Sequence, residues 1–202
     1  MKWLLALCFL FPIAVFAEQF PALFDVVGVD ATDQLNIRHD PAADTQVLGS
    51  LAHDAADVEV VMLSGTKAWG LVNIGERSGW VSMRFLRRVT DTHSGSFPRP
   101  LRCFGTEPFW SAKIPVSGPV VVSFPNENPI EVELESPAIA QGRNDKFGFL
   151  ASTTDTGIVG AVTRAACSDG MSDRAFGMAI DLLTFPDDGD GTLLSGCCSL
   201  SE

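Results

Sequence analysis

The stretch that decides the fold of the first half of this chain runs from Leu35 to Leu86. It opens with Leu35-Asn36-Ile37-Arg38, carries Trp69-Gly70-Leu71-Val72 near its middle, and closes with Ser78-Gly79-Trp80-Val81-Ser82. Short alternating or β-branched runs are separated here by turn residues such as Asp, Pro, Gly and Ser. About five short strands at this spacing predict a small β-barrel, and residues 83–86 predict a single helical turn.

These motifs, with Pro41 shortly after the first of them, resemble the bacterial SH3-like (SH3b) domain. That family has Leu-Asn-Val-Arg before a proline, then Trp-Gly-x-Val and Gly-Trp-Val; this chain departs at His39-Asp40, where the family more often has Ser-Gly. The resemblance implies that residues 18–90 form a non-catalytic module of a kind often associated with cell-wall or peptide ligands. Trp69 and Trp80 are its candidate ligand-binding residues. We also expect at least one of them to be a core residue, because small barrels need large apolar side chains inside.

Residues 1–17 have the pattern of a secretory signal peptide. Lys2 supplies a positive charge, residues 3–16 are almost entirely apolar, and Ala17 ends the segment. The apolar run is shorter than the ~20 residues that a membrane span needs. We therefore expect cleavage after Ala17, a periplasmic or secreted mature chain, and no integral membrane association.

The chain is acidic, with a formal net charge of −11 at pH 7. Such a charge repels nucleic acid and anionic lipid, so nucleic-acid binding is excluded. His39, His53 and His93 all precede residue 101. The second half alone can therefore build neither a Ser-His-Asp nor a Cys-His arrangement. We expect no cofactor and no bound metal.

Four cysteines follow the signal segment, and all lie in the second half: Cys103, Cys167, Cys197 and Cys198. An even number in an exported chain indicates disulfides, whereas adjacent cysteines without a nearby histidine are a weak zinc pattern. A bridge between Cys197 and Cys198 needs a strained ring, so Cys103 and Cys167 should each pair with one of them. If the adjacent pair lies on a strand, its side chains point to opposite faces, and one bridge is internal while the other is external.

The second half, residues 101–202, also has a β pattern without a helical period. In Ile130–Glu135 the apolar and acidic residues alternate, as expected of a strand with one face in a core. The candidate strands are Phe109 to Ile114, Val120 to Phe124, Ile130 to Glu135, Ile158 to Arg164 and Phe176 to Leu183. We expect a disulfide-bonded antiparallel barrel, since closure removes exposed strand edges. Residues 91–100 are polar and contain Gly and Pro, and form the expected linker of an all-β, two-domain chain.

The second half carries two unusual signatures, Cys103-Phe104-Gly105-Thr106-Glu107-Pro108-Phe109-Trp110 and Cys167-Ser168-Asp169-Gly170-Met171-Ser172-Asp173-Arg174. Together with Gly196-Cys197-Cys198 they resemble a family of uncharacterised bacterial envelope proteins and predicted lipoproteins. This chain lacks the lipobox of the lipoprotein members. The resemblance implies location and fold rather than an activity.

Five residues of these signatures are candidate ligand-binding residues: Glu107, Trp110, Asp169, Asp173 and Arg174. One interpretation is a capped loop, because Asp side chains accept backbone N–H bonds and glycine permits positive φ. The other is a polar recognition site beside Trp110. Paired carboxylates also perform acid–base catalysis, but nothing in their spacing indicates hydrolysis.

These features predict an exported, non-enzymatic cell-envelope binding protein whose SH3-like domain engages peptidoglycan, a peptide or an envelope protein. One alternative is an envelope hydrolase that uses acidic residues of the second half. Another is a structural or inhibitor-like partner of a second exported protein. The lack of a histidine and of a nucleophile motif in the second half favours binding over catalysis.

Overall fold

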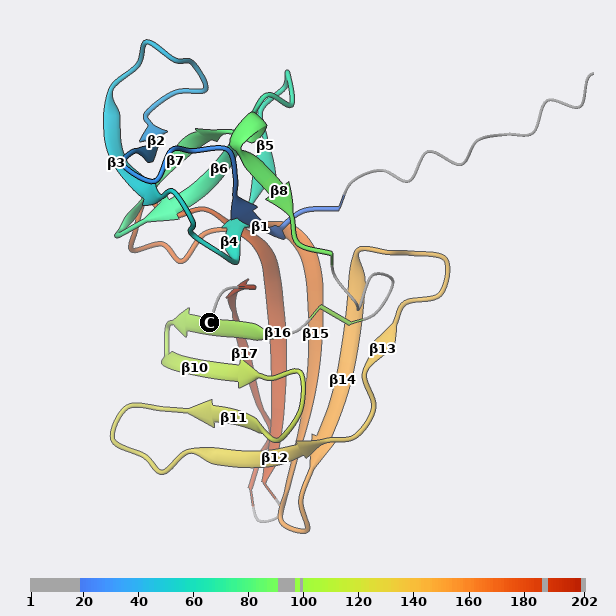
Figure 1. Ribbon diagram of the computed structural model, residues 1–202. Coiled ribbons are helices and arrows are strands. Elements are labelled where there is room, and N and C mark those ends of the chain that lie inside the picture. The colour runs from blue at the N-terminus through green and yellow to red at the C-terminus, as the bar shows by residue number, and fades with distance from the viewer. Residues whose placement is uncertain (1–18, 91–96, 99, 187–188, 201–202) are drawn as a thin grey trace, which may run out of the picture.

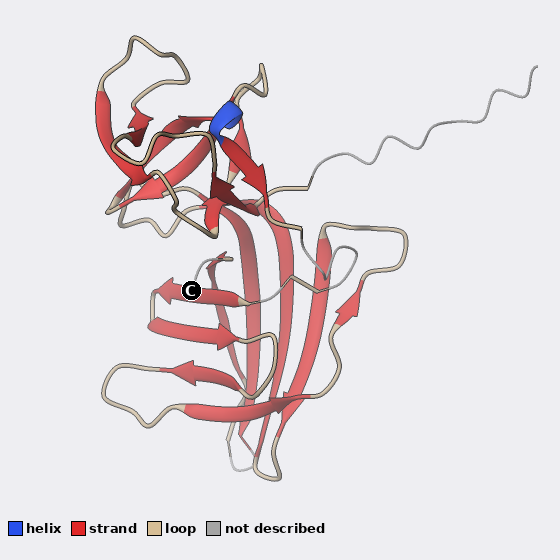
Figure 2. Cartoon of the chain, in the orientation of Figure 1, coloured by secondary structure: helices blue, strands red, loops and turns tan. Residues whose placement is uncertain are grey.

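The computed structural model describes residues 19–90, 97–98, 100–186 and 189–200 (Figure 1). These residues form strands and turns with a single 3₁₀ helix, η1 (Met83–Phe85), so the described chain is all-β (Figure 2). The helix confirms the helical turn expected at residues 83–86. The expected signal peptide, residues 1–17, lies outside the described residues. No helix in the described part is long and apolar enough to cross a membrane.

The N-terminal unit, residues 19–90, consists of two antiparallel sheets, coloured blue to green in Figure 1. The larger sheet has the order β3-β2-β7-β6-β5 and the smaller has the order β4-β1-β8. The strands are β1 (Ala22–Val26), β2 (Gln34–Arg38), β3 (Val47–Ala52), β4 (Val58–Val60), β5 (Met62–Leu63), β6 (Trp69–Ile74), β7 (Arg77–Ser82) and β8 (Leu86–Arg88). Only Val61 separates β4 from β5, so the chain passes from one sheet to the other at this residue.

Strand alternation decides which side chains fill the core of this unit. Val72 and Val81 are buried in it, and the neighbouring core-facing position on β6 is Gly70. A Cβ on Gly70 would lie 2.6 Å from the nearest side-chain atom, so the core is already full there. Trp69 and Trp80 occupy the opposite face and are only half-buried. The expectation that at least one of these tryptophans is a core residue is therefore wrong, because valine and glycine occupy the core positions of β6 and β7.

The C-terminal unit is a closed antiparallel barrel of eight strands. Its sheet has the order β12-β11-β10-β9-β17-β16-β15-β14-β13, and an additional pairing of β12 with β14 closes the ring. The strands are β9 (Leu101–Thr106), β10 (Phe109–Ile114), β11 (Val120–Ser123), β12 (Ile130–Leu134), β13 (Ala138–Ile139), β14 (Lys146–Ser152), β15 (Thr156–Cys167), β16 (Phe176–Pro186) and β17 (Thr192–Ser199). The predicted all-β fold with an antiparallel barrel is confirmed.

The barrel interior is packed with side chains and is not a channel. Buried apolar residues from every strand of the ring form one cluster. Phe97 joins this cluster, packing edge-on against Phe147 and Phe149 with ring centroids 6.1 and 5.7 Å apart. The expected linker, residues 91–100, is therefore too long at its C-terminal end, because burial of the Phe97 ring makes that residue part of the barrel.

The two predicted disulfides are present as expected. Cys103 pairs with Cys198, and Cys167 pairs with Cys197. Cys103 and Cys198 belong to the barrel core, where β9 and β17 are neighbours. Cys197 points out of the barrel, so its bridge holds the end of β15 and the loop that follows.

The N-terminal unit rests on the upper ends of β15 and β16 in Figure 1. The Asn73 amide donates to the Ala175 carbonyl at 2.8 Å and accepts from the Ala175 N–H at 3.0 Å. Arg164 Nη1 donates to the carbonyl of Pro21 at 3.0 Å. The Pro21 ring in turn lies against Gly177, where a Cβ would be 2.7 Å from Cδ of the proline. A glycine at position 177 thus allows close approach of the two units.

Candidate functional site

The loop between β15 and β16 carries the second cysteine signature, and Asp169 organises it. The Asp169 carboxylate accepts from the Met171 and Ser172 N–H groups at 3.0 and 2.9 Å and from Ser172 Oγ at 2.7 Å. Burial alone would raise the pKa of Asp169, but these hydrogen bonds outweigh it and hold the pKa below its ordinary value. The Asp169 carbonyl also accepts from Thr106 Oγ1 at 3.0 Å, which ties the loop to the end of β9. Asp169 is therefore a loop cap, as the first interpretation expected.

The next residue of the signature, Asp173, connects the loop to the N-terminal unit. Its N–H donates to the Glu76 carbonyl at 2.9 Å, and its backbone forms an isolated parallel bridge with Arg77. The Asp173 side chain itself is exposed. Asp173 therefore contacts the N-terminal unit through its main chain.

Arg174 lies at the same join, and its guanidinium sits 4.9 Å from the centroid of the Phe176 ring. The positive charge of Arg174 acts to lower the pKa of the Glu59 carboxyl on β4. Oε1 of Glu59 accepts a hydrogen bond from the Leu200 N–H at 2.9 Å. Burial of Glu59 between the two units raises the pKa of its carboxyl to about 7; the Leu200 hydrogen bond and Arg174 only partly oppose the shift. Arg174 and Glu59 thus belong to the interface rather than to an open recognition site.

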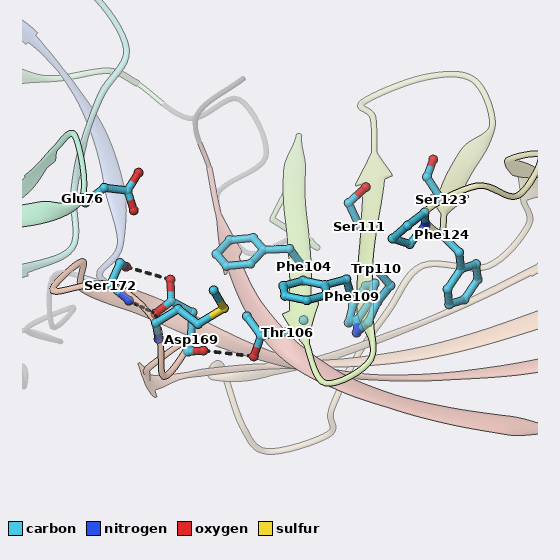
Figure 3. A pocket seen from close by; sticks show the side chains of 13 residues that line it. Glu76, Phe104, Thr106, Phe109, Trp110, Ser111, Ser123, Phe124, Asp169 and Ser172 are labelled. Carbon is cyan, nitrogen blue, oxygen red and sulfur yellow. Dashed lines mark hydrogen bonds between the residues drawn. The ribbon is translucent and has the colours of Figure 1, made fainter.

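A pocket of about 500 Å³ lies between this loop and the β9–β10 hairpin (Figure 3). Its lining is mainly apolar and includes Phe104, Phe109, Trp110, Phe124 and Met171. Phe109 and Met171 are 56% and 69% exposed, which is unusual for side chains of their size. Sequence reasoning missed both residues, although each lies within a signature that it singled out.

Trp110, a candidate ligand-binding residue, is 4% exposed and belongs to the same core cluster as Cys103. The ring has room because Gly105 and Gly196 face it without side chains. Its Nε1 is buried and has no hydrogen-bond partner among the described residues. Trp110 therefore supports the wall of the pocket from within the barrel.

A second groove, also of about 500 Å³, lies on the N-terminal unit. Trp69 and Phe85 give it aromatic surface, while Asp33, Arg38 and Arg84 give it charges of both signs. Trp80 is not part of its lining. On the neighbouring strand β2, Trp80 is paired with Arg38, whose Nη1 donates to the Thr45 carbonyl at 2.8 Å. Of the two candidate tryptophans, only Trp69 lines this groove.

Five of the seven predicted site residues divide among three places, while Trp110 is buried in the barrel core and Trp80 lies outside the N-terminal groove. Glu107 is exposed in the β9–β10 turn and lines a groove of the barrel together with Asp169. Asp173 and Arg174 face the interface between the units, and Trp69 lies in the N-terminal groove. Alternation around Val72 could have placed Trp69 on the outer face. No local signal in the sequence indicates which loop contacts the N-terminal unit.

Comparison of the chain with protein-family models, with curated proteins and with solved structures finds no match. Within the described residues, no group of three or more His, Cys, Asp or Glu side chains is placed to hold a metal ion.

Proposed function

We propose that this protein is an exported, non-catalytic binding protein of the cell envelope, in which an SH3-like N-terminal unit holds a peptide or the peptide part of peptidoglycan. The observation that carries the proposal is the groove around Trp69, which combines aromatic and oppositely charged side chains. Two disulfides in one small barrel support export, because such bridges persist in oxidising compartments.

The chemistry of the groove suits a short peptide with a free amine and a free carboxylate. Arg38 and Arg84 are available to carboxylates, and Asp30 and Asp33 are available to amines. The hydrogen bond from the Thr32 N–H lowers the pKa of Asp30, which keeps that carboxylate charged. Trp69 offers a flat apolar surface for an aliphatic side chain or a sugar ring.

Binding rather than catalysis is favoured by the composition of the groove. Its lining, drawn from described residues, contains neither histidine nor cysteine, and Ser82 is its only hydroxyl side chain. A serine nucleophile needs an adjacent base, most often a histidine. The proposal therefore assigns the groove to recognition.

The test is a pull-down of the mature chain on purified cell-wall sacculi, with release of soluble muropeptides measured in the same samples. We expect retention without release, and a loss of about tenfold in affinity for Trp69→Ala, since its ring supplies the main apolar contact. Trp80→Ala is the matched control: it removes an equally half-buried tryptophan of the same sheet and should retain binding. Absence of retention, or equal retention by Trp69→Ala, would remove the wall-binding function. Release of muropeptides would replace it by hydrolysis.

A further inference from the structure

The outer wall of the barrel carries a second and larger groove, of about 870 Å³, which is separate from the Trp69 groove. Its floor is formed by outward-facing residues of β16, β17 and β9, among them Asp181 and Ser195, whose Oγ donates to Asp181 Oδ1 at 2.6 Å. The Cys167–Cys197 bridge forms part of one wall, and Glu107 stands in the opposite turn. The disulfide fixes the first wall, and the hydrogen bond from Thr106 Oγ1 to the Asp169 carbonyl ties the end of β9 to the loop. The groove is therefore preformed.

This groove adjoins the apolar pocket of Figure 3. Phe104, Phe109 and Met171 line both spaces, and Phe109 and Met171 are exposed. Apolar surface at loop tips is costly in water and marks interaction sites when it is rimmed by polar groups. The two adjoining spaces, together called the barrel groove, therefore offer an apolar half and a polar half to one ligand.

The charged side chains that line the two spaces are all acidic. Glu107 and Asp181 line the larger groove, Glu76 lines the apolar pocket, and no described lysine, arginine or histidine lines either space. The Asp169 carboxylate is occupied by its own loop. Glu107 thus has no cationic neighbour in the lining, and Asp181 is held only by the Ser195 hydroxyl.

We propose that this barrel groove binds a peptide segment that carries a cationic side chain beside a large apolar one. The apolar side chain enters the pocket between Phe109, Met171 and Phe104, and the ammonium or guanidinium lies between Asp181 and Glu107. The acidic net charge of the chain attracts such a segment from a distance. The site lies mainly on the barrel and shares no lining residue with the Trp69 groove, so the two can be occupied together.

The experiment measures fluorescence anisotropy of a labelled pentapeptide with one central lysine between two leucines, titrated with the full mature chain. The comparison peptide has glutamate in place of lysine. We expect the lysine peptide to bind and the glutamate peptide not to bind. Asp181→Asn, which preserves the acceptor for Ser195, should weaken binding about fivefold, as expected for one solvent-exposed ion pair.

Met171→Ala should weaken binding about tenfold, because it removes apolar contact area from a residue that the fold does not bury. Glu133→Gln, an exposed carboxylate on β12, controls for net charge and should leave binding unchanged. Trp69→Ala should also leave it unchanged, which separates this site from the proposed wall-binding groove. The inference is overturned if neither peptide binds at millimolar concentration, if both bind equally, if Asp181→Asn and Met171→Ala bind as tightly as the parent, or if Trp69→Ala abolishes binding.

Discussion

The N-terminal unit and the barrel differ in how their strands are held. The N-terminal strands are at most six residues long and lie in two separate sheets, so β3, β5, β4 and β8 are edge strands. In the barrel, β15 and β16 have 12 and 11 residues, and the β12–β14 pairing closes the ring. Closure removes edges, whereas short open sheets bury little surface and need support from elsewhere.

That support comes from the barrel. Asn73, Glu59 and Glu76 of the N-terminal unit each make a hydrogen bond across the join. Leu23 of β1 packs against the apolar core of the barrel. The barrel closes on itself, whereas the N-terminal unit draws part of its stability from the surface on which it rests.

The largest expected loss of stability comes from a substitution in the wall of the barrel, at Gly196. A Cβ at Gly196 would collide with the main chain of Phe104 and lie 2.9 Å from Cζ2 of Trp110. Because neither group can move freely, Gly196→Ala should reduce the free energy of unfolding by about 3–5 kcal/mol. Differential scanning calorimetry should show both units destabilised, since the N-terminal unit loses its support.

Gly157→Ala is the control for that substitution. The nearest atom to its Cβ would be Cδ2 of Phe185 at 4.0 Å, which is ordinary contact. It should change the melting temperature little, or raise it slightly. A Gly196→Ala variant as stable as Gly157→Ala would show that the packing around Trp110 is looser than described.

Removal of the disulfides should have the second largest effect on the free energy of unfolding. Each bridge contributes about 2–4 kcal/mol, and its contribution rises with the length of the loop it closes. The Cys103–Cys198 bridge spans 95 residues and the Cys167–Cys197 bridge spans 30. The double variant Cys103→Ala/Cys198→Ala should therefore be less stable than Cys167→Ala/Cys197→Ala by about 1 kcal/mol.

Urea unfolding of the two double variants, followed by circular dichroism, measures this difference. Cys8→Ala in the precursor is a neutral control, because that cysteine belongs to the segment expected to be removed. The opposite order of stability would mean that the external bridge, which anchors the docking loop, matters more than the internal one.

The smallest expected change in stability comes from Glu59, at the interface between the two units. The folded state raises the pKa of Glu59 from 4.5 to about 7, so it binds this proton more tightly than the unfolded chain does. Its contribution to stability is therefore greatest below pH 4.5, falls as the pH rises from 4.5 to 7, and is lowest above pH 7. Glu59→Gln keeps an acceptor for the Leu200 N–H and should stabilise the protein by about 2 kcal/mol at pH 8.

Thermal melts of the parent and Glu59→Gln at pH 5 and pH 8 test this pH dependence of stability. The two proteins should melt at similar temperatures at pH 5 and diverge at pH 8. Glu133→Gln, on the exposed face of β12, should follow the parent at both values. If Glu59→Gln gains nothing at pH 8, the carboxyl is better solvated than the structure indicates.

The sequence predicted the all-β class, the antiparallel barrel and one bridge from each of Cys103 and Cys167 to the adjacent cysteines, because each depends on local patterns; it left open which of Cys197 and Cys198 pairs with Cys103. Alternation marks strands such as Phe109–Ile114, and adjacent cysteines on a strand must face opposite ways. It missed β14 (Lys146–Ser152), although Phe147, Phe149 and Ala151 alternate, because Gly148 interrupts the run of apolar residues. The SH3-like resemblance and the signal peptide remain predictions.

The candidate site was harder to predict, because it depends on which loop contacts which unit. Asp173 and Arg174 were grouped with Glu107 by chemistry, whereas the fold directs them toward the N-terminal unit. Met171 and Asp181 come together only through strand register and the Cys167 bridge. Such pairings follow from long-range contacts, which local periodicity does not contain.

The position of Cys197 and Cys198 on β17 has a consequence for the order in which this protein matures. A ribosome makes Cys103 and Cys167 first, and neither native partner exists until the chain has grown by a further 30 residues beyond Cys167. During that interval a bridge between the two early cysteines of the mature chain would be a non-native one. The strand that carries both late cysteines also lies between β9 and β16, so ring closure awaits the same segment. Native pairing therefore requires that the early thiols stay reduced, or exchange partners, until β17 is present.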